Sequence, residues 1–120
     1  GSDAHLCISS WTHTSKVLSS DPDGNVCMTE NRLGYWEKWQ VQKAPNGDGV
    51  LIQSVAHGRV LSIQNGILHT TTKIKQPSNA AKWHLEAAHQ HTCYLTCPLH
   101  NRQVASNKTD AMTTRHRKHW

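Results

Sequence analysis

The sequence repeats itself three times, at intervals of 43 or 44 residues. His13, His57 and His100 are 44 and 43 residues apart, and Trp39 and Trp83 are 44 residues apart. The same intervals separate Ile8, Ile52 and Leu95, and also Val17-Leu18-Ser19, Val60-Leu61-Ser62 and Val104-Ala105-Ser106. A period between about 20 and 50 residues is typical of folds built from repeated supersecondary units. We therefore expect three similar units, in a scaffold that serves binding more often than a single catalytic centre.

The length of 120 residues predicts one domain. We expect residues 1–4 to be a linker, since Gly1-Ser2 is typical of residues left by cloning, and residues 5–120 to form the domain. The three repeats then cover about 5–48, 49–91 and 92–120. No run of about 18 apolar residues occurs, so we expect no membrane span.

The net charge is modestly positive, with 13 Lys and Arg against 8 Asp and Glu. Ten histidines would add further positive charge below about pH 6. This balance indicates a solvated basic surface or an anionic partner such as an acidic protein face or a sulfated glycan. The longest basic block is residues 115–119, too short for a nucleic-acid-binding arm, so we do not expect nucleic acid as the partner.

The four cysteines do not form a disulfide framework. Cys93 and Cys97 would lie about 13 Å apart on one strand, too far to bridge. Cys7 and Cys27 could pair across a hairpin, and this possibility stays open. Cys7 and Cys93 occupy positions where the other repeats have Leu, Val or Tyr, which indicates small apolar side chains. We therefore expect a reducing, cytoplasmic location.

Each repeat alternates apolar and polar residues with a period of two, which predicts strands. In the second repeat the expected strands are 50–52, 59–62, 67–70 and 82–86, and Asn65-Gly66 predicts a tight turn. The first repeat has Asp23-Gly24-Asn25 at that turn. Trp120 falls where the fourth strand of the third repeat begins, so we expect that last strand to be truncated. Three units of four strands predict an all-β protein with a β-trefoil fold.

The apolar positions of these strands predict the core. We expect it to contain Leu6, Ile8, Leu18, Val26, Trp39, Val41, Val50, Ile52, Leu61, Leu68, Trp83, Leu85, Leu95 and Met112.

The segment 57–62, His-Gly-Arg-Val-Leu-Ser, followed by 82–86, Lys-Trp-His-Leu-Glu, resembles the repeat of the fascin and hisactophilin β-trefoils. The resemblance covers nearly the whole chain, best in the second repeat. It implies a module that binds actin or another protein and has no enzymatic activity. The resemblance to ricin-type lectins is weaker, because their Gln-x-Trp is replaced here, for example by Glu37-Lys38-Trp39.

Several side chains are candidates for contact with a partner. Trp11, Tyr35 and Trp36 break the threefold pattern, and we expect them to be exposed or to form a lid over the core. Lys73 and Lys75 belong to a basic loop of the second repeat. The repeated histidines, His57 among them, are expected to orient turns, and the repeated tryptophans to lie in the core rather than to stack on sugars.

The sequence gives little support for metal binding or catalysis. His89 and His91 lie near Cys93 and Cys97, and His116 precedes His119, but neither spacing matches a common zinc motif. We expect no metal, no cofactor and no catalytic residues.

Three functions remain open from the sequence. The first is binding to a protein, with actin or another cytoskeletal protein as the named candidate. The second is binding to carbohydrate, as a lectin-like β-trefoil. The third is docking, as one domain of a larger signalling or ubiquitin-pathway protein.

Overall fold

The computed structural model describes residues 5, 7–9, 16–30, 34–45, 49–65, 67–73, 81–87, 93–97, 102–106 and 111–114, with side chains as far as His84. These residues form ten strands and one short 3₁₀ turn, η1 (Tyr35–Glu37). The strands are β1 (Val17–Ser20), β2 (Val26–Thr29), β3 (Trp39–Lys43), β4 (Val50–Ser54), β5 (Arg59–Gln64), β6 (Ile67–Thr72), β7 (His84–Ala87), β8 (Cys93–Cys97), β9 (Arg102–Ser106) and β10 (Ala111–Thr114).

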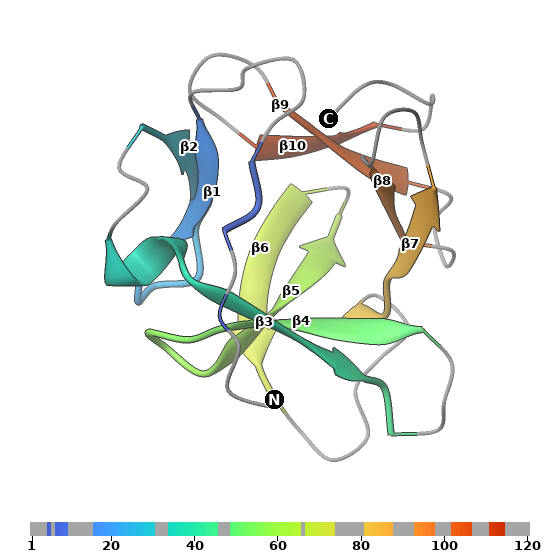
Figure 1. The fold of residues 1–120 in the computed structure, drawn as a ribbon, viewed down its shortest axis with the longest axis horizontal. Coiled ribbons are helices and arrows are strands. Elements are labelled where there is room, and N and C mark those ends of the chain that lie inside the picture. Colours follow the sequence, from blue (N-terminus) through green and yellow to red (C-terminus); the bar gives the residue numbers. More distant parts are fainter. Residues whose placement is uncertain are drawn as a thin grey trace.

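The strands follow the predicted threefold order. Antiparallel hairpins β1–β2, β5–β6 and β9–β10 are the equivalent units of the three repeats. The pairs β3–β4 and β7–β8 join each repeat to the next. Strands β2, β6 and β10 contact one another, so the three hairpins meet around a common axis (Figure 1). The all-β class and the β-trefoil are thereby confirmed.

Strand positions agree closely with the sequence pattern. In the second repeat, β4, β5 and β6 begin where the predicted strands 50–52, 59–62 and 67–70 begin, and β7 overlaps the predicted strand 82–86. Before β1, Ser9 pairs with Val17 in an isolated antiparallel bridge. The backbone N–H of Leu18 also donates to the Ile8 carbonyl at 2.8 Å. The predicted truncation at Trp120 lies outside the described residues.

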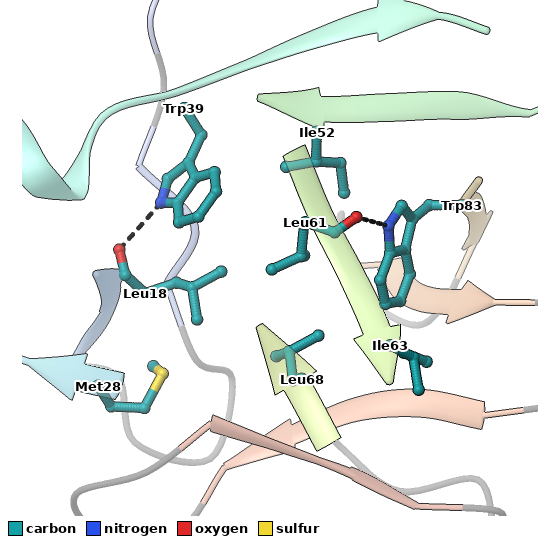
Figure 2. Close-up of a cluster of buried hydrophobic side chains, with 8 residues drawn as sticks. All are labelled: Leu18, Met28, Trp39, Ile52, Leu61, Ile63, Leu68 and Trp83. Atoms are coloured by element: carbon teal, nitrogen blue, oxygen red, sulfur yellow. Dashed lines mark hydrogen bonds between the residues drawn. The ribbon is translucent and has the colours of Figure 1, made fainter. Parts of the chain in front are cut away.

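The core contains the predicted side chains of the first two repeats (Figure 2). Six of them are buried: Leu18, Trp39, Ile52, Leu61, Leu68 and Trp83. Four are only partly buried and pack against that cluster: Ile8, Val26, Val41 and Val50. Four lie outside the described side chains: Leu6, Leu85, Leu95 and Met112.

The two buried tryptophans make the same hydrogen bond in their respective repeats. The indole Nε1–H of Trp39 donates to the Leu18 carbonyl at 3.0 Å, and that of Trp83 donates to the Leu61 carbonyl at 2.9 Å (Figure 2). Each bond ties the strand that follows a hairpin to the first strand of that hairpin. A buried indole needs such a partner, because an unpaired N–H away from water is costly. We call this bond the tryptophan latch.

The prediction that only alternate residues are buried was wrong for the central strands. All four residues of β1 are buried, and so are four consecutive residues of β5. A second apolar cluster covers the other face of the β4–β5 pair, and it consists of Ala44, Leu51, Val60 and Ala81. Ala44 directly follows β3 and Ala81 precedes β7, so the flanking chain covers a face that the pattern assigned to solvent.

The structure answers the open question of a disulfide between Cys7 and Cys27. Cys7 and Cys27, both among the described residues, are exposed and form no disulfide with each other. Cys7 therefore differs from its repeat equivalent Leu51, which is buried. In the described part of the chain, none of the helical segments has the length and hydropathy of a membrane span.

Candidate functional site

A short turn places two aromatic side chains on the surface. In η1 the backbone N–H of Glu37 donates to the Gly34 carbonyl at 3.3 Å, and that of Lys38 donates to the Tyr35 carbonyl at 3.2 Å. Tyr35 is 57% exposed and Trp36 is 46% exposed, whereas Glu37 is 4% exposed. The sequence left two alternatives for these side chains, exposure or a lid over the core, and the structure shows that Tyr35 and Trp36 are exposed. We call Tyr35 and Trp36 the aromatic pair.

Buried polar groups hold the aromatic pair from below. The Ser19 hydroxyl donates to Glu37 Oε2 at 2.5 Å. The Ser20 hydroxyl lies 3.0 Å from Ser54 Oγ and 3.5 Å from the Trp36 carbonyl. A hydrogen bond inside a protein is electrostatically stronger than the same bond in water. These bonds join η1 to β1, and Ser20 in turn joins β1 to Ser54 of β4.

His57 connects the aromatic pair to the turn between β4 and β5. Its Nε2 lies 3.2 Å from the Ser20 carbonyl, which can only accept, so Nε2 carries the proton. Its backbone N–H donates to Ser54 Oγ at 3.3 Å, which fixes the turn. The imidazole packs edge-on against Trp36 with 5.5 Å between ring centroids. This bears out, at His57, the expectation that the repeated histidine orients a turn; His13 and His100 lie outside the described residues.

Two lysines flank the same region. Lys38 Nζ lies 5.5 Å from the centroid of the Tyr35 ring. Lys73 Nζ donates to Gln42 Oε1 at 2.8 Å, with Gln53 Oε1 at 3.5 Å, and the Gln53 amide donates to the Gly58 carbonyl of the 55–58 turn. The predicted contact residues Trp36 and Lys73 are thus both linked to that turn. Of the other three predicted contact residues, Tyr35 lies beside Trp36 on η1, and Trp11 and Lys75 lie outside the described residues.

A second surface feature lies between two hairpin tips. An open depression of about 230 Å³ is lined by Asp23, Gly24, Asn25, Gln64, Asn65, Ile67 and His69. The sequence singled out several of these residues as turn formers but not as a site. The depression needs the tips of two different repeats, and their proximity is a tertiary property. The one available signal was the polar composition of both tips.

The first of these tips is fixed by Asp21. Its Oδ1 accepts from the backbone N–H groups of Asp23 and Asn25, each at 2.9 Å, and its Oδ2 accepts from Asn25 Nδ2 at 3.1 Å. The bond from the Asn25 backbone is the main reason that the pKa of Asp21 lies below its ordinary value.

Metal ligation finds no support in the part of the chain that is described. No group of three or more His, Cys, Asp or Glu side chains there could hold an ion. The histidine and cysteine pairs raised by the sequence, among them His89 with His91 and His116 with His119, lie outside the described side chains.

No family model and no curated protein matches the chain. Solved structures do match. A mosquitocidal holotoxin superposes with a TM-score of 0.82 at 15% sequence identity, over 96% of this chain and 16% of the toxin chain. SeviL bound to the asialo-GM1 saccharide superposes with a TM-score of 0.80 at 12% identity, over 95% of this chain and 89% of SeviL.

These similarities agree with the β-trefoil fold. They also bear on the resemblance to fascin and hisactophilin that the sequence suggested. The β-trefoil part of the sequence-based expectation is confirmed. The more specific likeness to fascin and hisactophilin finds no support among these structures. The chain corresponds to about one sixth of the holotoxin chain and to most of SeviL.

Proposed function

We propose that this protein is a non-enzymatic carbohydrate-binding module that holds a sugar ring against the aromatic pair. The observation that carries the proposal is the exposure of Tyr35 and Trp36 on a turn that is fixed from below. Large exposed aromatic side chains next to polar groups mark surfaces that bind a partner. The match to a lectin bound to a saccharide supports a sugar as that partner.

The chemistry of the aromatic pair fits a pyranose. One face of such a ring presents C–H groups, which an indole or phenol ring shields from water, and its edges present hydroxyl groups. The Tyr35 hydroxyl and the Lys38 ammonium can donate to those hydroxyls. The Nε2–H of His57 donates to the Ser20 carbonyl, and this bond holds the imidazole in place. The imidazole in turn packs edge-on against the indole of Trp36.

The rigidity of the turn favours binding. A flexible loop would lose conformational entropy when a sugar orders it. Here Glu37 and the Ser20–Ser54 pair already fix the backbone beneath Trp36.

The site differs from the ricin type. The tryptophans at the Gln-x-Trp position, Trp39 and Trp83, have no exposed surface, and each donates its N–H to a carbonyl inside the core. They cannot stack on a ligand. The sequence prediction that they belong to the core is confirmed.

Binding to actin or another protein remains the second candidate, because exposed Tyr and Trp side chains also suit protein interfaces. Its support is the sequence resemblance of the second repeat, and neither structural match is described as an actin-binding protein. The third candidate, docking as one domain of a larger signalling or ubiquitin-pathway protein, would use the same surface around Tyr35 and Trp36.

A glycan array tests the proposal. The wild-type chain should bind a restricted set of glycans, and Trp36→Ala should lower the signal at least about tenfold, as expected for loss of a central aromatic contact. Lys43→Ala is the matched control, because Lys43 is exposed at the opposite end of β3 from η1.

An array without signal above background rejects the carbohydrate proposal. Co-sedimentation with filamentous actin at pH about 6 and about 7.5 is the parallel measurement for the second candidate. Pelleting that Trp36→Ala abolishes would favour actin over sugar.

A further inference from the structure

The depression between the hairpin tips is built by two repeats together. Residues 23–25 come from the tip of β1–β2, and the remaining lining residues come from the tip of β5–β6. Asn25 pairs with His69 across the junction, and the backbone N–H of Thr70 donates to the Gly24 carbonyl at 2.8 Å. The two walls are thus joined by backbone hydrogen bonds.

The walls are also rigid. Gly24 has φ +100°, and a Cβ built there would lie 3.0 Å from Arg59 Nη2 and 3.0 Å from the Thr70 carbonyl. Arg59 is itself held, with Nη2 donating to that carbonyl at 2.7 Å and Nε donating to Thr70 Oγ1 at 3.0 Å. A ligand would find these walls in place and would not have to order them.

The lining carries hydrogen-bonding groups that the described protein does not use. No hydrogen bond to the side chains of Gln64, Asn65 or His69 is found within the described residues, and the Asp23 carboxylate likewise accepts none there. Carboxylate and amide groups present paired acceptors or donors, which suit neighbouring hydroxyl groups of one ring. The same lining contains Ile67, a large hydrophobic residue that is 66% exposed.

We propose that this depression is a second saccharide site, separate from the aromatic pair, which takes one neutral hexose ring. Ile67 packs against the C–H face of the ring, and Asp23 with the amide side chains binds its hydroxyls. The volume of about 230 Å³ lies below the roughly 300 Å³ at which pockets for larger ligands begin, so it suits a single ring. The proposal takes its ligand class from the proposed function but rests on other residues.

The carboxylate of Asp23 sets the charge preference of the site. The chain has a net charge of +5, so its surface as a whole favours anionic ligands. Within the depression, however, a sulfate group would lie close to Asp23 and be repelled. The site should therefore prefer a neutral sugar to its sulfated form, against the trend of the whole surface.

Two-dimensional ¹H–¹⁵N NMR of the full chain, titrated with galactose, glucose, mannose and N-acetylgalactosamine, tests this site. At least one sugar should shift the amide signals of residues 23–25, 64–67 and 69 in a saturable manner. Asp23→Ala and Ile67→Ala should each weaken that binding about tenfold. Asp23→Asn should remove the preference for galactose over a sulfated galactose.

Trp36→Ala separates the two sites, because it removes the aromatic pair and leaves the depression intact. The shifts at residues 23–25, 64–67 and 69 should persist in this variant even where binding on the array is lost. Loss of those shifts in Trp36→Ala would overturn the second site and leave the aromatic pair as the sugar site. Absence of shifts with all four sugars, or unchanged binding in Asp23→Ala, would overturn it as well.

Discussion

The first and second repeats share one scaffold but fill it differently. Both have the tryptophan latch, from Trp39 to Leu18 and from Trp83 to Leu61. Two positions before the tryptophan of this latch, the first repeat has Glu37, which is hydrogen-bonded to Ser19. At the equivalent position the second repeat has Ala81, which packs in the second apolar cluster. The same backbone position is therefore buried in both repeats, with a carboxyl side chain in one and a methyl group in the other.

The comparison separates what the barrel requires from what a particular surface requires. Both repeats have a fully buried tryptophan that forms the latch, and both have a buried residue two positions before it. These are the features that the barrel requires. It does not need a carboxylate there. In the first repeat the carboxylate lies directly beneath the aromatic pair, so its role belongs to that surface.

Replacing either latch tryptophan tests the part that the repeats share. Trp39→Ala and Trp83→Ala should each lower the free energy of unfolding by about 3–5 kcal/mol, because each removes a fully buried side chain and orphans a carbonyl. Urea unfolding followed by circular dichroism measures both. If only one variant loses stability, the two latches are not equivalent.

Ala81→Glu transfers the charge of the first repeat to the second. The new carboxylate would lie among Ala44, Leu51 and Val60, and an unpaired buried charge should lower stability by about 3 kcal/mol or more. The unfolding free energy of Ala81→Gln, which has the same size without the charge, serves as control. Equal losses in the two variants would assign the effect to volume alone.

Glu37→Ala makes the opposite exchange and should have a smaller effect. It removes a carboxylate whose Oε1 is buried without a partner among the described residues, but it also leaves the Ser19 hydroxyl unpaired. We expect a loss of about 1–2 kcal/mol in unfolding free energy. Glycan binding should fall more in Glu37→Ala than in Glu37→Gln, which can still accept from Ser19. Equal binding by both variants would show that Glu37 does not position the aromatic pair.

The glycines of two turns provide a further comparison. Gly24 has φ +100° and close neighbours, whereas Gly58 has φ +67° and its nearest neighbour is Gln53 Nε2, 3.9 Å from a built Cβ. Gly24→Ala should therefore destabilise by about 2 kcal/mol and Gly58→Ala by about 1 kcal/mol. Thermal unfolding of the two variants in parallel gives the order. The reverse order would mean that crowding at Gly24 is relieved by movement of Arg59.

Asp21 should give the smallest effect and one that depends on pH. Its pKa is below the ordinary value of 3.8 because the Asn25 backbone stabilises the charged form. Its contribution to stability is therefore present above pH 3.8 and lost as the pH falls through the folded-state pKa. Asp21→Asn should lower the denaturation midpoint at neutral pH and approach the wild type in acid. A difference that stays constant with pH would exclude the charge as its cause.

Much of the fold was accessible from the sequence, because the repeated apolar positions are those that a threefold barrel must bury. The positions of β4, β5 and β6 and the burial of Trp39 and Trp83 followed from that pattern. The departure of Tyr35 and Trp36 from it left exposure or a lid over the core as alternatives, and only the structure shows the exposure. The burial of Leu51 and Val60 did not follow, because a period of two assigns one strand face to solvent and does not predict that Ala44 and Ala81 cover it.

By itself the sequence determined three β units, their latch tryptophans and an aromatic pair outside the repeat pattern. Tertiary structure alone decided that Glu37 is buried beneath that pair, that His57 supports Trp36, and that tips of two repeats enclose one polar depression. The physical reason is the separation of the contacting residues along the sequence. Periodicity reports which side of a strand a residue occupies, whereas these contacts join residues 18 to 44 positions apart, and closure of the barrel alone brings them together.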